Sequence, residues 1–106
     1  MLSRDVLIGK LQFAGVPPEK QQWVNRWIQI ADDEKIKQFL YTLTGASSIG
    51  GDAIKISDNS QGENAPLYFH TCFNLVDIPF ANIATEQDFK TVFESSLGGT
   101  KKYNRG

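Results

Sequence analysis

The most constraining feature of this sequence is a change in its hydrophobic period at Gly45. Before that residue, apolar side chains recur at the three- and four-residue spacing of amphipathic helices. The clearest run consists of Ile36, Phe39, Leu40 and Leu43. After Gly45, apolar and polar residues alternate, as they do in half-buried strands. A chain of 106 residues builds one core, so helices and strands have to share it, and their order predicts an α+β domain.

Three helices are predicted in residues 1–45. The first runs from the N-cap Ser3 to about residue 10, the second covers residues 19–31, and the third follows the N-cap Asp32. Gly45 follows the last periodic residue of the third helix and suits the left-handed position just past a helix end. The apolar stripes predicted for the first two helices consist of Val6, Leu7 and Leu11, and of Trp23, Trp27 and Ile30.

A small sheet of about four strands is predicted within residues 46–84. The strand candidates are residues 53–56, 67–69 and 74–78. Residues 85–97 are predicted to form a final helix, because Thr85 and Asp88 stand at capping-box spacing before an apolar stripe. Residues 98–106 are predicted to form a basic, flexible tail. We therefore expect one domain, in which N-terminal helices pack on a small sheet with a C-terminal helix.

The charge balance argues against two classes of partner. Eleven Lys and Arg residues face twelve Asp and Glu residues, for a net charge of −1, so no strong field favours nucleic acid or an anionic membrane. No apolar run approaches the roughly 20 residues that span a bilayer, and the first residues lack the pattern of a secretion signal. We expect neither a nucleic-acid partner nor a membrane partner.

The chain has one cysteine, Cys72, and one histidine, His70. One cysteine rules out an internal disulfide, a CxxC redox pair and a cysteine-rich zinc site. We expect neither a metal nor a cofactor. It also predicts a reducing compartment, the cytosol or the nucleus. In an extended chain, residues two apart point to one side, so His70 would be placed to take the thiol proton. A lone cysteine is also commonly a small buried hydrophobic residue, and this alternative stays open.

The residues around Cys72 resemble a known active site. The run consists of His70, Thr71, Cys72, Phe73 and Asn74, followed by Leu75, Val76, Asp77, Ile78 and Pro79. It resembles the signature Leu-Pro-x-x-His-Thr-Cys-Phe-Asn-x-Leu-x-Leu-Pro of HECT-type ubiquitin ligases. Residues 39–47 resemble the Phe-Leu-x-Phe-x-Thr-Gly-x-Ser stretch of the same family. Pro66 lies one position further from His70 than in that signature, which marks a divergent member.

This resemblance covers about residues 15–97 and implies the fold and activity of the C-terminal catalytic lobe of the HECT domain. Cys72 would accept ubiquitin as a thioester from a ubiquitin-conjugating enzyme and pass it to a lysine of a protein substrate. If Gly106 is the natural terminus, Tyr103 would correspond to the aromatic residue that the family commonly carries four from its C-terminus; the alternative is an aromatic residue in a frayed tail. The conjugating enzyme would dock on a larger N-terminal lobe, so the C-terminal lobe alone would be an incomplete ligase.

Each residue that would support Cys72 has a structural interpretation beside its catalytic one. Thr71 and Asn74 would either hold the turn or donate to the developing oxyanion. His70 would orient the cysteine or pack beneath it, and Asp77 would help to deprotonate the incoming lysine or be a solvated carboxylate. Phe73 is predicted to anchor the loop in the core. For the whole chain, the alternatives are a non-catalytic module that binds ubiquitin or a partner, with a structural cysteine, and a coincidental motif.

Overall fold

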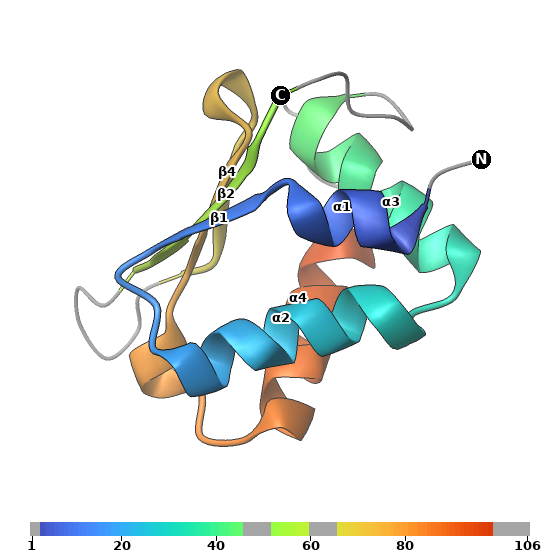
Figure 1. Ribbon diagram of the computed structural model, residues 1–106. Coiled ribbons are helices and arrows are strands. Elements are labelled where there is room, and N and C mark those ends of the chain that lie inside the picture. Colours follow the sequence, from blue (N-terminus) through green and yellow to red (C-terminus); the bar gives the residue numbers. More distant parts are fainter. Residues whose placement is uncertain (1–2, 46–51, 60–65, 99–106) are drawn as a thin grey trace.

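Helices cover one face of a four-stranded sheet in the computed structural model, which describes residues 3–45, 52–59 and 66–98 (Figure 1). The helices are α1 (Arg4–Gly9), α2 (Pro18–Ile30), α3 (Asp33–Thr44) and α4 (Glu86–Gly98). The strands are β1 (Leu11–Ala14), β2 (Ile54–Asp58), β3 (Tyr68–His70) and β4 (Leu75–Ile78), and the short 3-10 helices are η1 (Thr71–Phe73) and η2 (Phe80–Asn82). The predicted α+β class is confirmed. None of the described helices is long and apolar enough to cross a membrane.

The sheet has the strand order β1-β2-β4-β3, with β1, β2 and β4 parallel and β3 antiparallel to β4. Strand β1 corrects the prediction that residues 1–45 are entirely helical. Leu11, expected on the stripe of the first helix, pairs with Ile54, and the backbone N–H of Ile54 donates to Lys10 O at 2.8 Å. A four-residue alternation is too short to be separated from a helical stripe by its period, and its strand partner lies far along the chain.

Side-chain and backbone signals at the helix ends agree with the sequence-based predictions. Asp32 Oδ1 accepts a hydrogen bond from the backbone N–H of Lys35 at 2.8 Å, which caps α3. Gly45 ends that helix in the left-handed conformation, with φ of 81°. Thr85 Oγ1 accepts from the backbone N–H of Asp88 at 3.1 Å and caps α4. These local contacts explain why the predicted helix boundaries lie within a residue or two of the observed ones.

The core between the helices and the sheet is dominated by one aromatic cluster. Its members are Trp23, Trp27, Phe39, Phe80, Phe89 and Phe93, all of them buried, with neighbouring ring centroids 4.8–6.5 Å apart. Two predicted core residues lie outside it, because Val6 is 52% exposed and Ile30 is 67% exposed. Ile30 is the last residue of α2. It shares a helical face with buried residues, but no other described element covers its side chain at the helix end.

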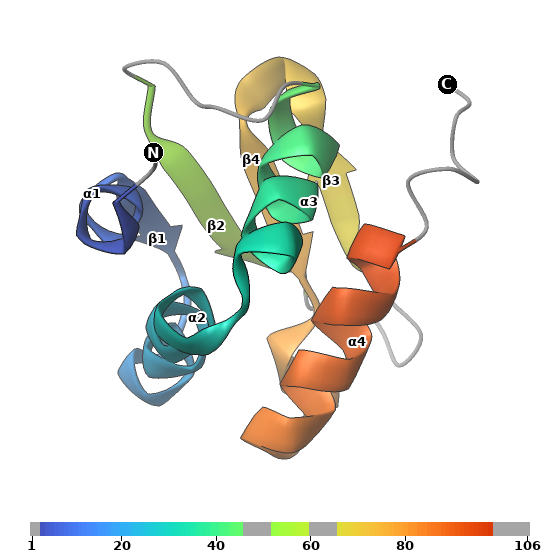
Figure 2. The same cartoon turned by 90° about the vertical axis from the view of Figure 1, so that its right-hand side faces the viewer.

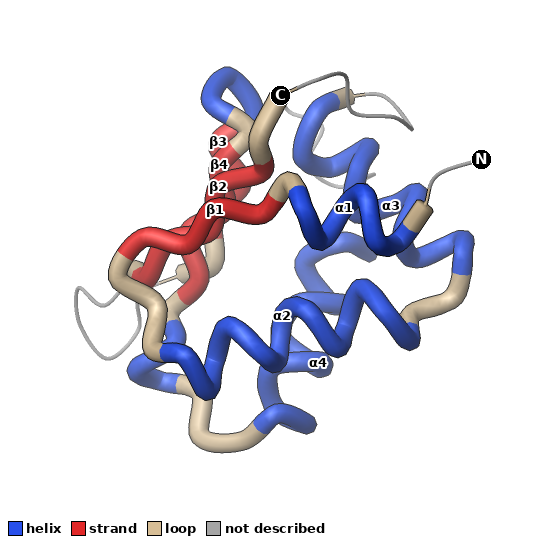
Figure 3. The backbone as a smooth tube through the Cα atoms, in the orientation of Figure 1, coloured by secondary structure: helices blue, strands red, loops and turns tan. Residues whose placement is uncertain are grey.

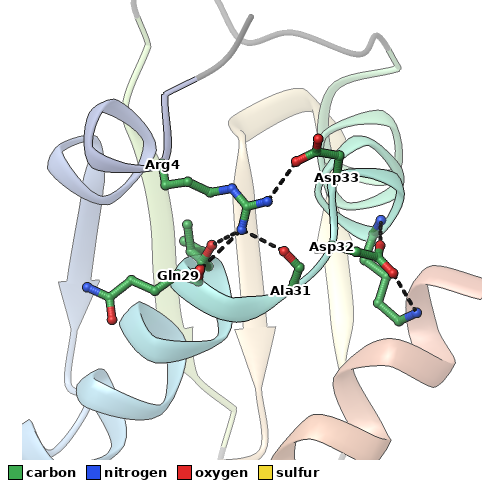
Figure 4. Close-up of polar contacts among 7 residues, drawn as sticks. Arg4, Gln29, Ala31, Asp32 and Asp33 are labelled. Atoms are coloured by element: carbon green, nitrogen blue, oxygen red, sulfur yellow. Dashed lines mark hydrogen bonds and ion pairs between the residues drawn. The ribbon is translucent and has the colours of Figure 1, made fainter.

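The side chain of Arg4 ties α1 to the junction between α2 and α3 (Figure 4). Its Nη1 donates to the backbone oxygens of Ile28 at 2.8 Å and Ala31 at 2.6 Å, and its Nη2 donates to Asp33 Oδ1 at 2.7 Å. The last carbonyl groups of a helix have no hydrogen-bond donor within the helix, and the guanidinium group of Arg4 donates to those at the end of α2.

Two further polar contacts join α2 to α4. Arg26 Nε and Nη2 donate to the two carboxylate oxygens of Glu86 at 2.7 and 2.9 Å, and Trp27 Nε1 donates to Glu94 Oε2 at 2.9 Å. The hydrogen bond from Arg26 lowers the pKa of Glu86 from its usual 4.5. The same hydrogen bond raises the pKa of Arg26.

Candidate functional site

The segment that carries the cysteine motif forms a tight turn between β3 and β4. The strand β3 ends at His70, η1 follows, and Asn74 takes the left-handed conformation with φ of 52° and ψ of 45° before β4 begins. Asparagine is one of the few residues that adopt this conformation readily. The carbonyl of Asn74 accepts a hydrogen bond from the backbone N–H of Lys55 at 2.9 Å. The turn lies beside α3 (Figure 2), so it is held at the sheet and at the helical layer.

The backbone of Cys72 lies in the middle of η1, and the position of its side chain is not among those described. Its neighbours Thr71 and Phe73 are exposed, Phe73 to 64%. The prediction that Phe73 anchors the loop in the core is therefore wrong. Phe69 packs there instead, with its ring centroid 6.4 Å from that of Phe39. Phe73 would share a face with Phe69 if β3 continued as a strand, and the 3-10 turn of residues 71–73 breaks that alternation.

The turn also removes the geometric basis for placing His70 and Cys72 on one face. That prediction assumed an extended chain, in which residues two apart point to the same side. The extended chain ends at His70, and the residues from Thr71 to Phe73 follow a 3-10 path instead.

The histidine side chain binds Asp77 instead. His70 Nε2 lies 2.9 Å from Asp77 Oδ2. The register of β3 and β4 explains the contact, because His70 is opposite Leu75, and Asp77, two residues along β4, points to the same face of the sheet. The side chains of His70 and Asp77 are 35% and 27% exposed. Asp77 is thus a bound carboxylate that solvent still reaches.

A third residue, Ser57, completes this array and was not predicted. Its hydroxyl donates a hydrogen bond to Asp77 Oδ1, from the strand on the other side of β4. Ser57 and Asp77 are direct partners in the parallel register of β2 and β4. The alternation of Ile54 and Ile56 puts Ser57 on the polar face of its strand, which is the one sequence signal available. Its proximity to Asp77 depends on a register that no local pattern specifies.

We call the Ser57, Asp77 and His70 side chains the polar array. Because successive residues of a strand point to opposite faces, the array lies on the face of the sheet opposite the buried Ile56 and Val76. None of the helices α1–α4 covers this outer face (Figure 3). The ring of Tyr68, on the same face of β3, has its centroid 5.5 Å from that of His70. The array offers a proton donor and acceptor pair next to the cysteine turn. Among the described residues, no group of three or more His, Cys, Asp or Glu side chains is arranged to hold a metal ion.

Several predicted features lie outside the described residues. Tyr103 and most of the predicted tail belong to them, and so does the loop of residues 46–51, which includes the last two residues of the 39–47 stretch that resembles the HECT family.

The described part of the chain is a small α+β domain with a mixed sheet, a surface turn that holds the single cysteine, and a polar array beside that turn. Comparison of the sequence with known protein families gives no match, and comparison with curated proteins gives none either.

Proposed function

We propose that this chain is the C-terminal catalytic lobe of a HECT-type ubiquitin ligase, in which Cys72 accepts ubiquitin as a thioester. The observation that carries the proposal is that the His-Thr-Cys-Phe-Asn run, which resembles the family's active site, folds as a surface turn between two strands. Thr71 and Phe73, on either side of the cysteine, are exposed. A cysteine that attacks a thioester at the C-terminus of another protein has to lie on an accessible surface segment, as a turn with exposed neighbours does.

The reaction proposed for Cys72 has two steps. First, the Cys72 thiolate attacks the carbonyl carbon of a thioester between ubiquitin and a conjugating enzyme. A new C–S bond forms, the old one breaks, and the enzyme's thiolate leaves. Second, a substrate lysine attacks the new thioester, so that a C–N bond forms and Cys72 leaves as a thiolate. Exchange between thioesters of similar thiols is nearly balanced, so positioning and thiolate fraction control its rate.

The residues around the cysteine take supporting roles in this proposal. Asn74 holds the turn through its left-handed backbone and its carbonyl contact with Lys55. Thr71, which is exposed beside the cysteine, donates to the oxyanion in this proposal. The paired His70 and Asp77 receive the proton that the attacking amine loses. The proposal includes a protein substrate, a conjugating enzyme, an N-terminal lobe that docks this enzyme, and a location in the cytosol or nucleus.

The test uses ubiquitin activated as a small-molecule thioester, which removes the need for an N-terminal lobe. Because the chain has one cysteine, a thiol-dependent adduct reports on Cys72 alone. We expect the parent chain to form an adduct of one ubiquitin on a non-reducing gel, and thiol reductant to remove it. The matched control is Cys72→Ala, which we expect to form no such adduct.

The opposite result is equally informative. If the folded parent chain forms no adduct while a thiol reagent titrates Cys72 rapidly, the catalytic assignment is wrong. If Cys72 reacts with the thiol reagent only after unfolding, the cysteine is structural, and the proposal fails as well.

The second candidate function, a module that binds ubiquitin or another partner without transfer, is favoured by a different observation. Two aromatic side chains near the turn are exposed, Tyr68 to 55% and Phe73 to 64%, and aromatic residues are enriched in protein interfaces. Titration of labelled chain with ubiquitin would give NMR shift changes around the turn. On this hypothesis Phe73→Ala weakens binding while Tyr41→Ala, at a 60% exposed position on α3, leaves it unchanged, and no adduct forms in the thioester assay.

A further inference from the structure

The Asp77 carboxylate lies between two partners that come from the neighbouring strands. Ser57 on β2 binds one carboxylate oxygen, and His70 on β3 lies 2.9 Å from the other. We propose that Ser57 is a positioning residue, which holds the Asp77 carboxylate in the orientation that fixes the proton of His70 on Nε2. The local alternation indicates only that Ser57 lies on the polar face of β2, and the pairing of three strands places it beside Asp77.

The hydrogen-bonding capacity of the three groups fixes the direction of both contacts. A carboxylate only accepts hydrogen bonds, so the Ser57 hydroxyl and the His70 ring nitrogen must both donate. Neutral imidazole carries one N–H, and its other nitrogen is an acceptor. With the proton on Nε2, the lone pair of His70 is on Nδ1. The array therefore presents a single basic nitrogen on the residue from which the cysteine turn starts.

The serine contributes orientation. The carboxylate torsion of aspartate has a broad, roughly two-fold preference, and Asp77 is 27% exposed, so water can replace either partner. A second hydrogen bond, on the oxygen that does not face His70, restricts the rotation of the carboxylate. A histidine whose tautomer is set by a hydrogen-bonded carboxylate is a recurring arrangement in proton transfer and metal ligation.

The consequence for catalysis rests on the proposed function. When the substrate amine attacks the thioester of Cys72, its nitrogen bonds to the carbonyl carbon, the C–S bond breaks and the thiolate leaves. The nitrogen loses one proton, which passes to Nδ1 of His70 and from there to solvent. Loading starts from the Cys72 thiolate and releases the thiolate of the donor, so it has no amine proton to remove. Ser57 should therefore affect the discharge of ubiquitin to an amine and leave loading unchanged.

The first experiment measures loading from the small-molecule ubiquitin thioester and discharge to free lysine as separate rates. We expect Ser57→Ala to load like the parent and to discharge about tenfold more slowly, a part of the contribution of a general base. Ser57→Thr keeps the hydroxyl on a strand that favours β-branched residues and should discharge within about twofold of the parent. Ser95→Ala, at an exposed serine on α4, is the matched control and should change neither rate.

A double-mutant cycle distinguishes positioning through Asp77 from an independent effect. In an Asp77→Ala background, Ser57→Ala should produce no further slowing. The proposal is overturned if Ser57→Ala discharges at the parent rate, if its effect is additive with that of Asp77→Ala, or if Ser57→Thr is as slow as Ser57→Ala.

A second experiment does not depend on ubiquitin. His70 is the only histidine in the chain, so the ¹⁵N NMR signals of imidazole report on it alone. At a pH where the ring is neutral, we expect the parent and Ser57→Thr to have the proton almost entirely on Nε2. Ser57→Ala and Asp77→Ala should show a larger share of the Nδ1–H form. Identical tautomer populations in all four chains would overturn the positioning role, and an altered population in a chain that never loads ubiquitin would refute only the proposed function.

Discussion

The two faces of the sheet are built from the same strands and have opposite properties. The inner face carries Ile54, Ile56, Val76 and Ile78, all of them completely buried against the helical layer. On the outer face, the same strands β2 and β4 carry Ser57 and Asp77, which bind each other and remain open to solvent. Because successive side chains of a strand point to opposite sides, two substitutions one residue apart can affect the core in one case and the polar face in the other.

This difference separates stability from chemistry. Burial of apolar side chains is the main favourable contribution to folding, and here it is concentrated on the inner face and in the aromatic cluster. The polar array is partly exposed, so its hydrogen bonds compete with water and add little to the free energy of unfolding. The outer face is therefore free to carry groups chosen for reactivity or binding.

The largest expected effect on stability is in the buried core, at Phe93 of α4. Its side chain is 1% exposed, and its ring centroid lies 4.8 Å from that of Trp27 and 5.6 Å from that of Phe39. Phe93→Ala should lower the free energy of unfolding by about 3–5 kcal/mol, through lost burial and the cavity left behind. Urea denaturation followed by circular dichroism measures this loss. Val92→Ala, one residue along α4 at a 37% exposed position, should cost below about 1 kcal/mol, and equal losses would contradict the comparison.

A smaller effect is expected where the helical layer depends on a polar contact. Arg4→Ala removes the donors to Ile28 O and Ala31 O and should cost roughly 2 kcal/mol, because charged donors to backbone oxygens are among the stronger hydrogen bonds. Asp33→Ala removes only the ion pair, at a side chain that is 81% exposed, and should cost below about 1 kcal/mol. A larger loss for Asp33→Ala in thermal or urea unfolding would show that the ion pair dominates this junction.

The sharpest comparison uses two adjacent residues of β3. Phe69 packs against Phe39 and Phe93, so Phe69→Ala should cost about 2–4 kcal/mol. His70→Ala, on the outer face, should cost below about 1 kcal/mol while it slows discharge of ubiquitin from Cys72. Both are measured by urea denaturation of the purified variants. If His70→Ala destabilised the chain as much as Phe69→Ala, the polar array would be a structural element, and the separation of the two faces would be wrong.

The smallest expected effect concerns the Arg26–Glu86 pair at the surface. The pKa of Glu86 is lower in the folded protein than its usual 4.5, chiefly because Arg26 donates hydrogen bonds to it. A carboxyl group of this kind stabilises the fold above its unfolded pKa, and the contribution is lost as the pH falls through the folded pKa. Between neutral and acidic pH, the melting temperature of the parent should fall slightly more than that of Glu86→Gln. The difference should shrink in high salt, and a parent less sensitive to acid than Glu86→Gln would contradict the assignment.

The helices could be predicted from sequence because their signals are local. The caps at Asp32 and Thr85, the left-handed glycine at position 45 and the helical spacing of Trp23 and Trp27 each act within a few residues. Capping contacts and a shared helical face need only the chain's own next turns. The prediction that Ile30 and Val6 lie on buried helix faces failed, because burial depends on whether another element extends far enough to cover the side chain.

The candidate site was predictable only in part. The motif points to Cys72, His70 and Asp77, and alternation correctly indicates a strand for Asp77. The same alternation, extended past the end of β3, assumed an extended chain where the backbone of residues 71–73 follows a 3-10 path. The exposure of Phe73 was also missed, because a 3-10 turn has neither the period of a strand nor that of a helix.

The sequence by itself determined the helices, the apolar and polar sides of β2 and β4, and the motif around the cysteine. Only the tertiary structure decided that residues 11–14 form a strand, that Ser57 lies opposite Asp77, and that His70 binds Asp77. The physical reason is the range of the interactions. Caps and periodicity arise between neighbours in the chain, whereas the register of a parallel sheet is set by packing the apolar sides of distant segments against one core.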